Sequence, residues 1–170
     1  DESWGHYALA GYHVYTGRFD LAISAYEKAL SLNPTDADIL MDFAMCLCSA
    51  GRKKEAIEIA QSAMRLNPHC PEWYLAQMGE LCFEAHRYAE AVVAFERLTS
   101  MDTVHIRLIE AASHAALGQA DQARCAVERA LQLDPQATVR ICTSAERAPY
   151  GDLGDREHFR ENLRRAGLPE

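Results

Sequence analysis

The sequence lacks any run of apolar residues long enough to cross a bilayer. A membrane-spanning helix needs about 18–20 apolar residues in a row, and no stretch of this 170-residue chain approaches that length. Excess positive charge is also lacking, because 25 acidic residues outnumber 17 lysines and arginines and give a net charge of −8. Nucleic acid attracts basic surfaces through its phosphates. The sequence therefore predicts no membrane span and no nucleic-acid partner.

Motifs for catalysis and for cofactor binding are lacking as well. The chain has no G-x-S-x-G, no Walker-type loop, no Rossmann glycine cluster and no H-E-x-x-H, the patterns that position nucleophiles, phosphates or zinc. None of its six cysteines forms a C-x-x-C pair. His69 and Cys70 are neighbouring metal-ligand types, but no second pair lies at a ligand-like spacing. We predict no enzyme activity, no cofactor, no metal, and a reduced, cytoplasmic protein.

The chain repeats itself with a period of about 34 residues. Asn33-Pro34 and Asn67-Pro68 lie 34 residues apart. Three units share a glycine, an alanine five residues later and another alanine seven residues after that: Gly17, Ala22 and Ala29; Gly51, Ala56 and Ala63; Gly118, Ala123 and Ala130. Glycine just past a helix end adopts the left-handed conformation that reverses the chain, and alanine lets two helix backbones approach closely. The pattern predicts repeated helical hairpins.

A third unit, between the second and the last, keeps only part of this pattern. Ala91 takes the first alanine place and Phe95 an aromatic place, but Ala85-His86 replaces the glycine and Leu98 replaces the second alanine. Apolar residues recur at three and four throughout, which is typical of amphipathic helices. The spacing predicts eight helices at about residues 2–16, 19–32, 36–50, 53–66, 71–85, 88–100, 104–117 and 120–133, then one over 136–145 and a last one over about 155–166.

The pattern resembles the tetratricopeptide repeat (TPR) family. The family's small-residue place holds Ala10, Ala44, Gly79 and Ala111, while Glu110 departs most from its apolar pattern, at the leucine place of the fourth unit. The resemblance implies an all-α fold: a right-handed α-solenoid of four TPR helical hairpins plus C-terminal capping helices. The array would span residues 1–135, with repeats at about 3–36, 37–70, 72–103 and 104–137, and residues 136–170 would form capping or tail helices.

The C-terminal part carries a second resemblance. Ala148-Pro149-Tyr150-Gly151-Asp152, a following helix with Phe159 and Leu163, and the ending Ala166-Gly167-Leu168-Pro169 resemble the C-terminal TPR regions of bacterial class III adenylate/guanylate cyclase-type signalling proteins. The run LNP-x-x-PEWYL at residues 66–75 is similar to their middle repeats. This resemblance implies that the chain is the C-terminal scaffold or regulatory arm of a larger protein, with any upstream targeting segment or domain missing. No residue here resembles the cyclase metal or nucleotide site.

The TPR resemblance also implies where a ligand binds, because first helices line a concave groove in that family. Its contact positions fall here on Trp4, Tyr7, Asp38, Met41, Asp42, Met45, Trp73, Gln77, Glu80 and Phe83. Aromatic and methionine side chains favour apolar segments, and the carboxylates favour basic ones. The clamp of chaperone-binding TPRs is missing at Tyr7 and Asp42, which disfavours an acidic or carboxylate-ended ligand. The alternative is that several of these side chains pack between repeats as core.

We therefore expect a non-catalytic module that binds a protein or peptide segment, including an upstream domain of the same polypeptide. The alternative is a homodimerisation module that uses the terminal repeat and the C-terminal helix. That helix, Arg156–Arg165 with Phe159 and Leu163, itself combines apolar anchors with arginines. It either occupies a groove, in its own chain or in a neighbour, or caps the last repeat. The sequence leaves both possibilities open.

Overall fold

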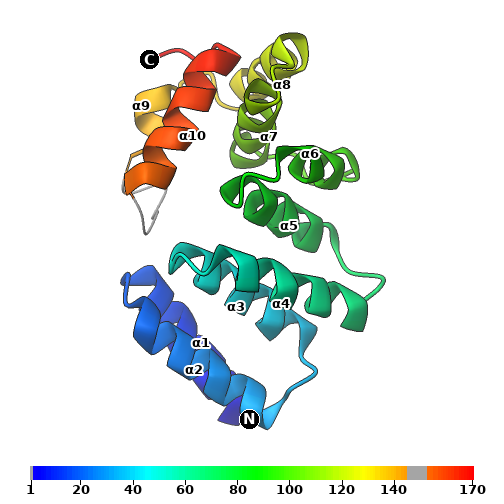
Figure 1. Cartoon of the computed structure of the whole chain (residues 1–170), viewed down its shortest axis with the longest axis vertical. Coiled ribbons are helices and arrows are strands. Elements are labelled where there is room, and N and C mark those ends of the chain that lie inside the picture. Colours follow the sequence, from blue (N-terminus) through cyan, green and yellow to red (C-terminus); the bar gives the residue numbers. More distant parts are fainter. Residues whose placement is uncertain (1, 145–152) are drawn as a thin grey trace. The chain divides into compact units, whose positions relative to one another are not determined.

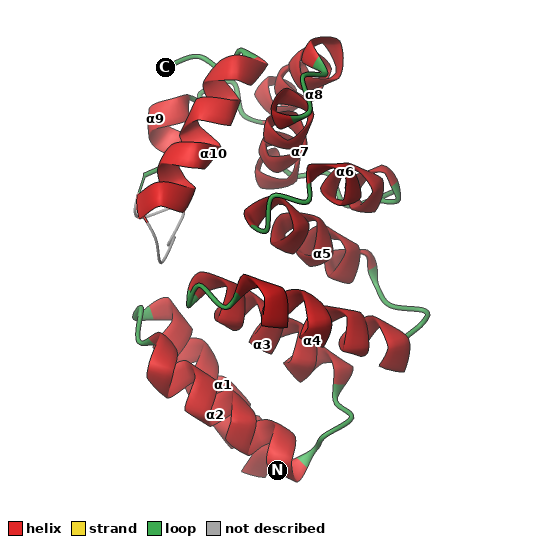
Figure 2. Ribbon diagram, in the orientation of Figure 1, coloured by secondary structure: helices red, strands yellow, loops and turns green. Residues whose placement is uncertain are grey.

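The structure, a computed structural model, describes residues 2–144 and 153–170, and within those two ranges it contains helices and turns but no strand (Figures 1 and 2). The helices are α1 (Glu2–Tyr15), α2 (Phe19–Leu32), α3 (Ala37–Ser49), α4 (Lys53–Leu66), α5 (Glu72–Glu84), α6 (Tyr88–Glu96), α7 (Val104–Ala116), α8 (Ala120–Leu133), α9 (Val139–Cys142) and α10 (Leu153–Ala166). The predicted all-α class is confirmed.

Each hairpin turns through a residue with a positive φ angle. Gly17, Gly51 and Gly118 have φ of 70°, 82° and 75°. In the third hairpin His86 takes the same place with φ of 60°, a conformation that costs a side chain about 1 kcal/mol. The backbone bonds are nonetheless the same, since Arg18 N–H donates to His13 O at 2.8 Å and Arg87 N–H donates to Cys82 O at 2.7 Å. The turn geometry therefore survives the loss of glycine.

Small residues fill the centre of each hairpin, as the repeat spacing predicts. Ala22, Ala56, Ala91 and Ala123 have no exposed surface, and neither do Ala10, Ala44, Ala29, Ala63 and Ala130. The third hairpin differs, because Gly79 stands opposite the ring of Phe95: a Cβ atom at Gly79 would lie 2.5 Å from Phe95 Cε1. Glycine there gives the large ring room that alanine would occupy.

Helix α6 is shorter than predicted. The expected helix over residues 88–100 ends at Glu96, and the last turn tightens, with Leu98 N–H donating to Phe95 O at 3.0 Å. Leu98 stands where the other repeats have a fully buried alanine, and it packs half-buried against the core of its hairpin. A leucine is too bulky for the close crossing that alanine allows. The substitution was visible in the sequence, but its effect on the helix end was not.

The chain forms two compact units, Asp1–Tyr74 and Leu75–Glu170. In the first unit, α1 packs on α2, α2 on α3 and α3 on α4. The rings of Tyr26 and Phe43 meet with centroids 5.4 Å apart and so join the first hairpin to the second. In the second unit, α6 packs on α7 and α7 on α8, and α10 packs mainly on α7.

The fourth repeat replaces apolar contacts by an ion-pair network. Arg107, whose side chain is 8% exposed, donates from Nε to Asp102 Oδ1 at 2.6 Å and from Nη1 to Glu110 Oε2 at 2.7 Å. The hydrogen bond from Arg107 lowers the pKa of Asp102 below its ordinary value. Glu110 therefore fits its place in the repeat, because Arg107 one turn earlier in α7 neutralises it.

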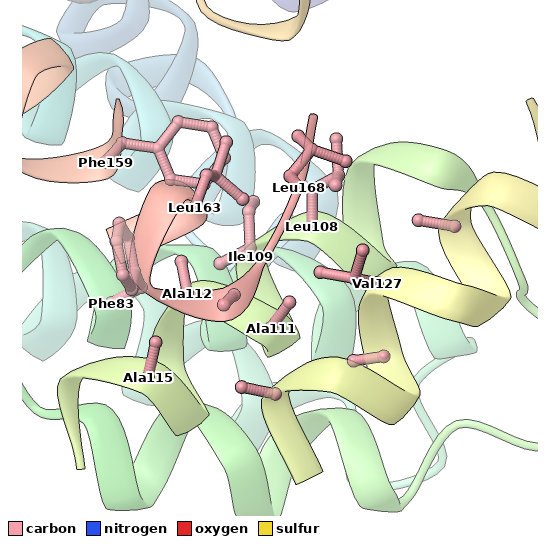
Figure 3. Packing of buried hydrophobic residues seen from close by; sticks show 14 of the residues in the cluster. Phe83, Leu108, Ile109, Ala111, Ala112, Ala115, Val127, Phe159, Leu163 and Leu168 are labelled. Atoms are coloured by element: carbon pink, nitrogen blue, oxygen red, sulfur yellow. The ribbon is translucent and has the colours of Figure 1, made fainter. Parts of the chain in front are cut away.

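The C-terminal segment departs from the predicted helix over residues 136–145. Of the described residues 136–144, Val139–Cys142 form the helix, and the Thr138 hydroxyl sets its start by accepting from Ile141 N–H at 3.2 Å. Helix α10 then runs from Leu153 to Ala166. The Ala148–Asp152 motif lies outside the described residues. Figure 3 shows that α10 brings Phe159 and Leu163 against the buried cluster of the second unit.

Candidate functional site

The first unit presents an aromatic pair on α1. Trp4 is 59% exposed, and its ring meets that of Tyr7 edge to face, with centroids 5.2 Å apart. Tyr7 is half-buried and also lies 6.2 Å, centroid to centroid, from the buried Tyr26. The exposed ring of Trp4 thus packs against the half-buried ring of Tyr7. Such rigid aromatic surface is favourable for binding, because little conformational freedom remains to be lost.

Two carboxylates lie one turn apart on α3 and accept hydrogen bonds from tyrosines. Tyr7 Oη donates to Asp42 Oδ2 at 2.6 Å, and Tyr74 Oη donates to Asp38 Oδ1 at 2.6 Å. Burial of the phenol and the bond to the neighbouring carboxylate raise the pKa of Tyr7 and of Tyr74 far above the usual value. The phenols therefore stay protonated at neutral pH and hold the carboxylates in fixed positions.

The other candidates of the first unit differ in exposure. Met45 is half-buried on α3. Trp73 is half-buried on α5, and its ring centroid lies 4.2 Å from that of Tyr74. Met41 has no exposed surface and belongs to the core. We therefore remove Met41 from the candidate surface. The remaining set, which we call the first-unit surface, consists of Trp4, Tyr7, Asp38, Asp42, Met45 and Trp73.

The second unit holds the other three candidates. Glu80 on α5 faces His105 on α7, with Oε2 and Nε2 3.3 Å apart, and this hydrogen bond raises the pKa of His105. Gln77 is half-buried on α5. Phe83 is 1% exposed, and its ring meets that of Phe159 on α10 with centroids 5.6 Å apart. Phe83 is therefore also removed from the candidate surface, because α10 covers it.

The role of Tyr74 was not predicted from the sequence. This residue is buried, and its hydroxyl reaches back one repeat to Asp38. The available signal was a hydroxyl-bearing side chain at the apolar place held by Ile39 and Ile106 in the neighbouring repeats. A buried phenol needs a partner for its hydroxyl, and the carboxylate supplies one.

The described residues offer binding surfaces but little reactive chemistry. Within residues 2–144 and 153–170, no three His, Cys, Asp or Glu side chains are grouped so that they could hold a metal ion. Burial raises the pKa of the Cys46 and Cys82 thiols to about 11, so both stay protonated and are poor nucleophiles at neutral pH. None of the helices in the described part is long and apolar enough to cross a membrane.

Comparison with known proteins identifies the repeats. Two family models, both described as tetratricopeptide repeat, match residues 14–78 and 77–138. The chain belongs to the tetratricopeptide repeat family. TPR proteins generally mediate protein–protein interactions, and the fold is typically non-catalytic.

Individual relatives agree with this assignment. The chain is 31% identical over 84 residues to small glutamine-rich tetratricopeptide repeat-containing protein 2 of Mycosarcoma maydis, in a match that covers 49% of this chain and 24% of that protein. The TPR chain thus spans about a quarter of that relative's length.

Solved structures share the fold at low identity. A structure of MamA (residues 41 to the end) from Desulfovibrio magneticus RS-1 superposes with a TM-score of 0.72 at 14% identity and covers 98% of this chain and 97% of that one. PilW, a type IV pilus biogenesis factor, gives a TM-score of 0.72 at 20% identity over 100% of this chain and 80% of that one. These similarities show a TPR solenoid fold.

Proposed function

We propose that this TPR chain is a non-catalytic protein-interaction module whose first-unit surface binds a segment with apolar anchors and positive charge. The observation that carries the proposal is the exposed Trp4 ring, whose neighbour Tyr7 donates a hydrogen bond to the Asp42 carboxylate. An exposed tryptophan has a hydrophobic cost in water that a ligand can remove. Aromatic side chains are enriched among the residues that dominate binding energy.

The carboxylates supply selectivity rather than most of the affinity. Asp38 and Asp42 accept hydrogen bonds from tyrosine hydroxyls, but neither bond removes the negative charge. A basic segment is attracted and an acidic one repelled, which changes the association rate more than the contact energy. The same charge disfavours ligands that end in a carboxylate.

A peptide titration tests the proposal. Fluorescently labelled peptides that share one apolar residue pattern but carry lysines or glutamates should differ, with the lysine peptide binding more tightly. Trp4→Ala and Trp73→Ala should each weaken its binding about tenfold, since truncating a central aromatic costs more than 1 kcal/mol. Leu21→Ala is the matched control, because Leu21 is 51% exposed on α2, outside the first-unit surface. Tighter binding of the glutamate peptide would refute the proposal.

Charge and shape are separated by a second pair of variants. Asp38→Asn and Asp42→Asn keep an oxygen that can accept the tyrosine hydroxyl, so the surface should keep its shape while losing charge. The lysine peptide should then bind more weakly and with less dependence on salt. Unchanged salt dependence in the double variant would exclude electrostatic selection by these two residues.

The cellular setting follows from the resemblance of the C-terminal sequence to cyclase-type TPR regions. In this proposal the chain is the C-terminal arm of a larger bacterial signalling protein in the cytoplasm, and its ligand is a partner protein or an upstream domain of the same polypeptide. Co-purification of the TPR chain with the upstream domain of the complete gene product tests this. An upstream domain that does not bind the TPR chain would exclude the intramolecular ligand.

Homodimerisation remains the second candidate, and one observation supports it. Leu9, Tyr12 and Tyr15 on α1 are 46%, 57% and 90% exposed, and Leu9 occupies the repeat position at which Phe43 meets Tyr26 of α2. In this form the surface of α1, rather than the terminal repeat, would join two copies. Light scattering of the wild type and of Tyr12→Glu decides: a dimer dissociated by the substitution supports it, and a monomer at high concentration excludes it.

A further inference from the structure

The inner face of the fourth repeat is apolar. Leu108, Ile109, Ala112 and Ala115 share one face of α7, and all four are at most 5% exposed. In the register of the repeats, Ile109 corresponds to Asp42 of the second repeat and Ala112 to Gly11 of the first. Asp42 is a half-buried carboxylate and Gly11 is exposed, so the first unit is less apolar at these two places. This face therefore needs a cover, because four apolar side chains would otherwise face water.

Helix α10 supplies that cover. Phe159, Leu163 and Ala166 follow one another at four and three residues, and each is at most 1% exposed. Phe159 and Leu163 belong to one buried cluster with Leu108, Ile109 and Ala112, and Figure 3 shows Leu163 next to Ile109. This spacing is the one by which an amphipathic helix lies in a hydrophobic groove.

The position of α10 is not that of a fifth repeat. Within the described repeats, a new first helix packs on the second helix before it, α3 on α2 and α7 on α6. Helix α10 instead packs mainly on α7, a first helix, and only slightly on α8. It also reaches the third repeat through Phe83. Helix α10 thus lies along the inner face of two repeats and does not extend the stack.

Two arginines of α10 form ion pairs within the C-terminal segment. Arg160 pairs with Glu157 at 2.8 Å, and Arg164 pairs with Glu170 at 2.7 Å. These ion pairs would persist if α10 left the groove. At the end toward the third repeat, the ring of His158 stacks on His86 with centroids 4.6 Å apart, and its Nε2 lies 2.8 Å from Tyr88 Oη.

The groove is not completely filled. A cleft of about 340 Å³ remains beside Phe159, lined also by Val104, His105, Leu108 and Cys142. Val104, His105 and Leu108 belong to the first helix of the fourth repeat, so this cleft continues the inner face past the edge of α10. An incoming helix could contact it before α10 is displaced.

We propose that α10 is a built-in ligand of the inner face of the third and fourth repeats, and that this face exchanges it for an amphipathic helix of a partner protein. The partner helix carries an aromatic residue, a leucine four positions later and a small residue three positions after that. This inner face shares no residue with the first-unit surface, so either proposal can be refuted without refuting the other.

The test weakens the packing of α10 in the 170-residue chain and supplies the same helix as a separate peptide. The probe is a labelled peptide of residues 153–170, titrated into the wild type and into the Phe159→Ala/Leu163→Ala variant. The variant should bind it at least about tenfold more tightly, because a site that is occupied most of the time shows a reduced apparent affinity. A peptide with Phe159→Ala should bind weakly, and one with Glu161→Ala should bind normally, because Glu161 is exposed on α10.

Hydrogen exchange on the wild type tests the proposal without any substitution, so it does not depend on a variant that folds. If α10 leaves the groove by itself, its amides should exchange by an opening that leaves those of α8 protected. Common exchange of α10 and α8 in one cooperative step would overturn the proposal. Loss of cooperative folding in the double variant would also overturn the proposal, because α10 would then be part of the core. Equal binding of the peptide by the variant and by the wild type would overturn it as well.

Discussion

Adding one methyl group at Gly79 tests the packing of the third hairpin most directly. The new Cβ atom would lie 2.5, 2.6 and 3.0 Å from three ring atoms of Phe95, which is 2% exposed. Carbon atoms normally approach to about 3.5–4.0 Å, so the buried ring must retreat by about 1 Å. Overpacking of this kind costs about 1–3 kcal/mol, while alanine in place of a helical glycine contributes about 1 kcal/mol. We expect Gly79→Ala to be neutral to about 2 kcal/mol destabilising.

The matched control is Gly11→Ala. Gly11 also lies inside a helix, but an added Cβ there would meet no atom within 4 Å. This variant should therefore gain about 1 kcal/mol from helix propensity alone. The difference between the two variants, measured by urea denaturation, isolates the steric cost at Gly79. Equal stabilisation of both would refute the packing argument.

A double-mutant cycle sharpens the test, because the chain itself contains the compensated pair. The fourth repeat has Ala111 and Val127 at the places of Gly79 and Phe95. Combining Gly79→Ala with Phe95→Val should reproduce that pair, so the double variant should be more stable than the sum of the single losses by about 1–3 kcal/mol. Strict additivity would show that the methyl group and the ring do not compete for space.

Three further outcomes follow from burial and charge. Ala56→Leu should lose about 1–3 kcal/mol in urea denaturation, since Ala56 has no exposed surface; an unchanged midpoint would contradict the assigned register. Iodoacetamide, followed by mass spectrometry, should label the exposed Cys125 well before Cys46, whose pKa burial raises to about 11; the reverse order would refute this. NMR titration should place the pKa of His105 above 6.5, and Glu80→Gln should lower it. Because the folded pKa is the higher one, this pair stabilises below about pH 6.5 and loses its contribution as pH rises through the folded value; the effect is small, since the His105 side chain is 53% exposed. An unchanged pKa of His105 in Glu80→Gln would exclude the hydrogen bond between the two side chains.

The hairpins could be predicted from the sequence because local rules and the repeat agree. The five-residue step from Gly17 to Ala22 predicts both a turn and a buried helix face, and it occurs three times in the chain. The short α6 could not be predicted in the same way, since its end depends on how Leu98 packs in three dimensions. Arg107 and Glu110 each violate the apolar pattern alone, and only their mutual ion pair makes them compatible with a packed helix.

The candidate surface was predicted less completely than the fold. Repeat position predicts which side of a helix would contact a ligand, and on that side Trp4 is exposed and Asp42 is half-buried. It does not tell what else covers that side. Phe83 is buried by α10, a helix that lies outside the repeat and whose position no periodicity reports. For the same reason the inner residues Ala112 and Ala115 could not be recognised as a covered groove.

The strained turn at His86 has a consequence for how such a chain can change over generations. A side chain in this backbone conformation is tolerable while its ring stacks on His158 of α10 and on Tyr88. A lineage that lost the C-terminal helix would lose much of that compensation, and mutation to glycine would become favourable there. We therefore expect the residue at this turn and the presence of α10 to be coupled in evolution. Glycine at this turn in a relative would mark a tail that no longer docks in this way.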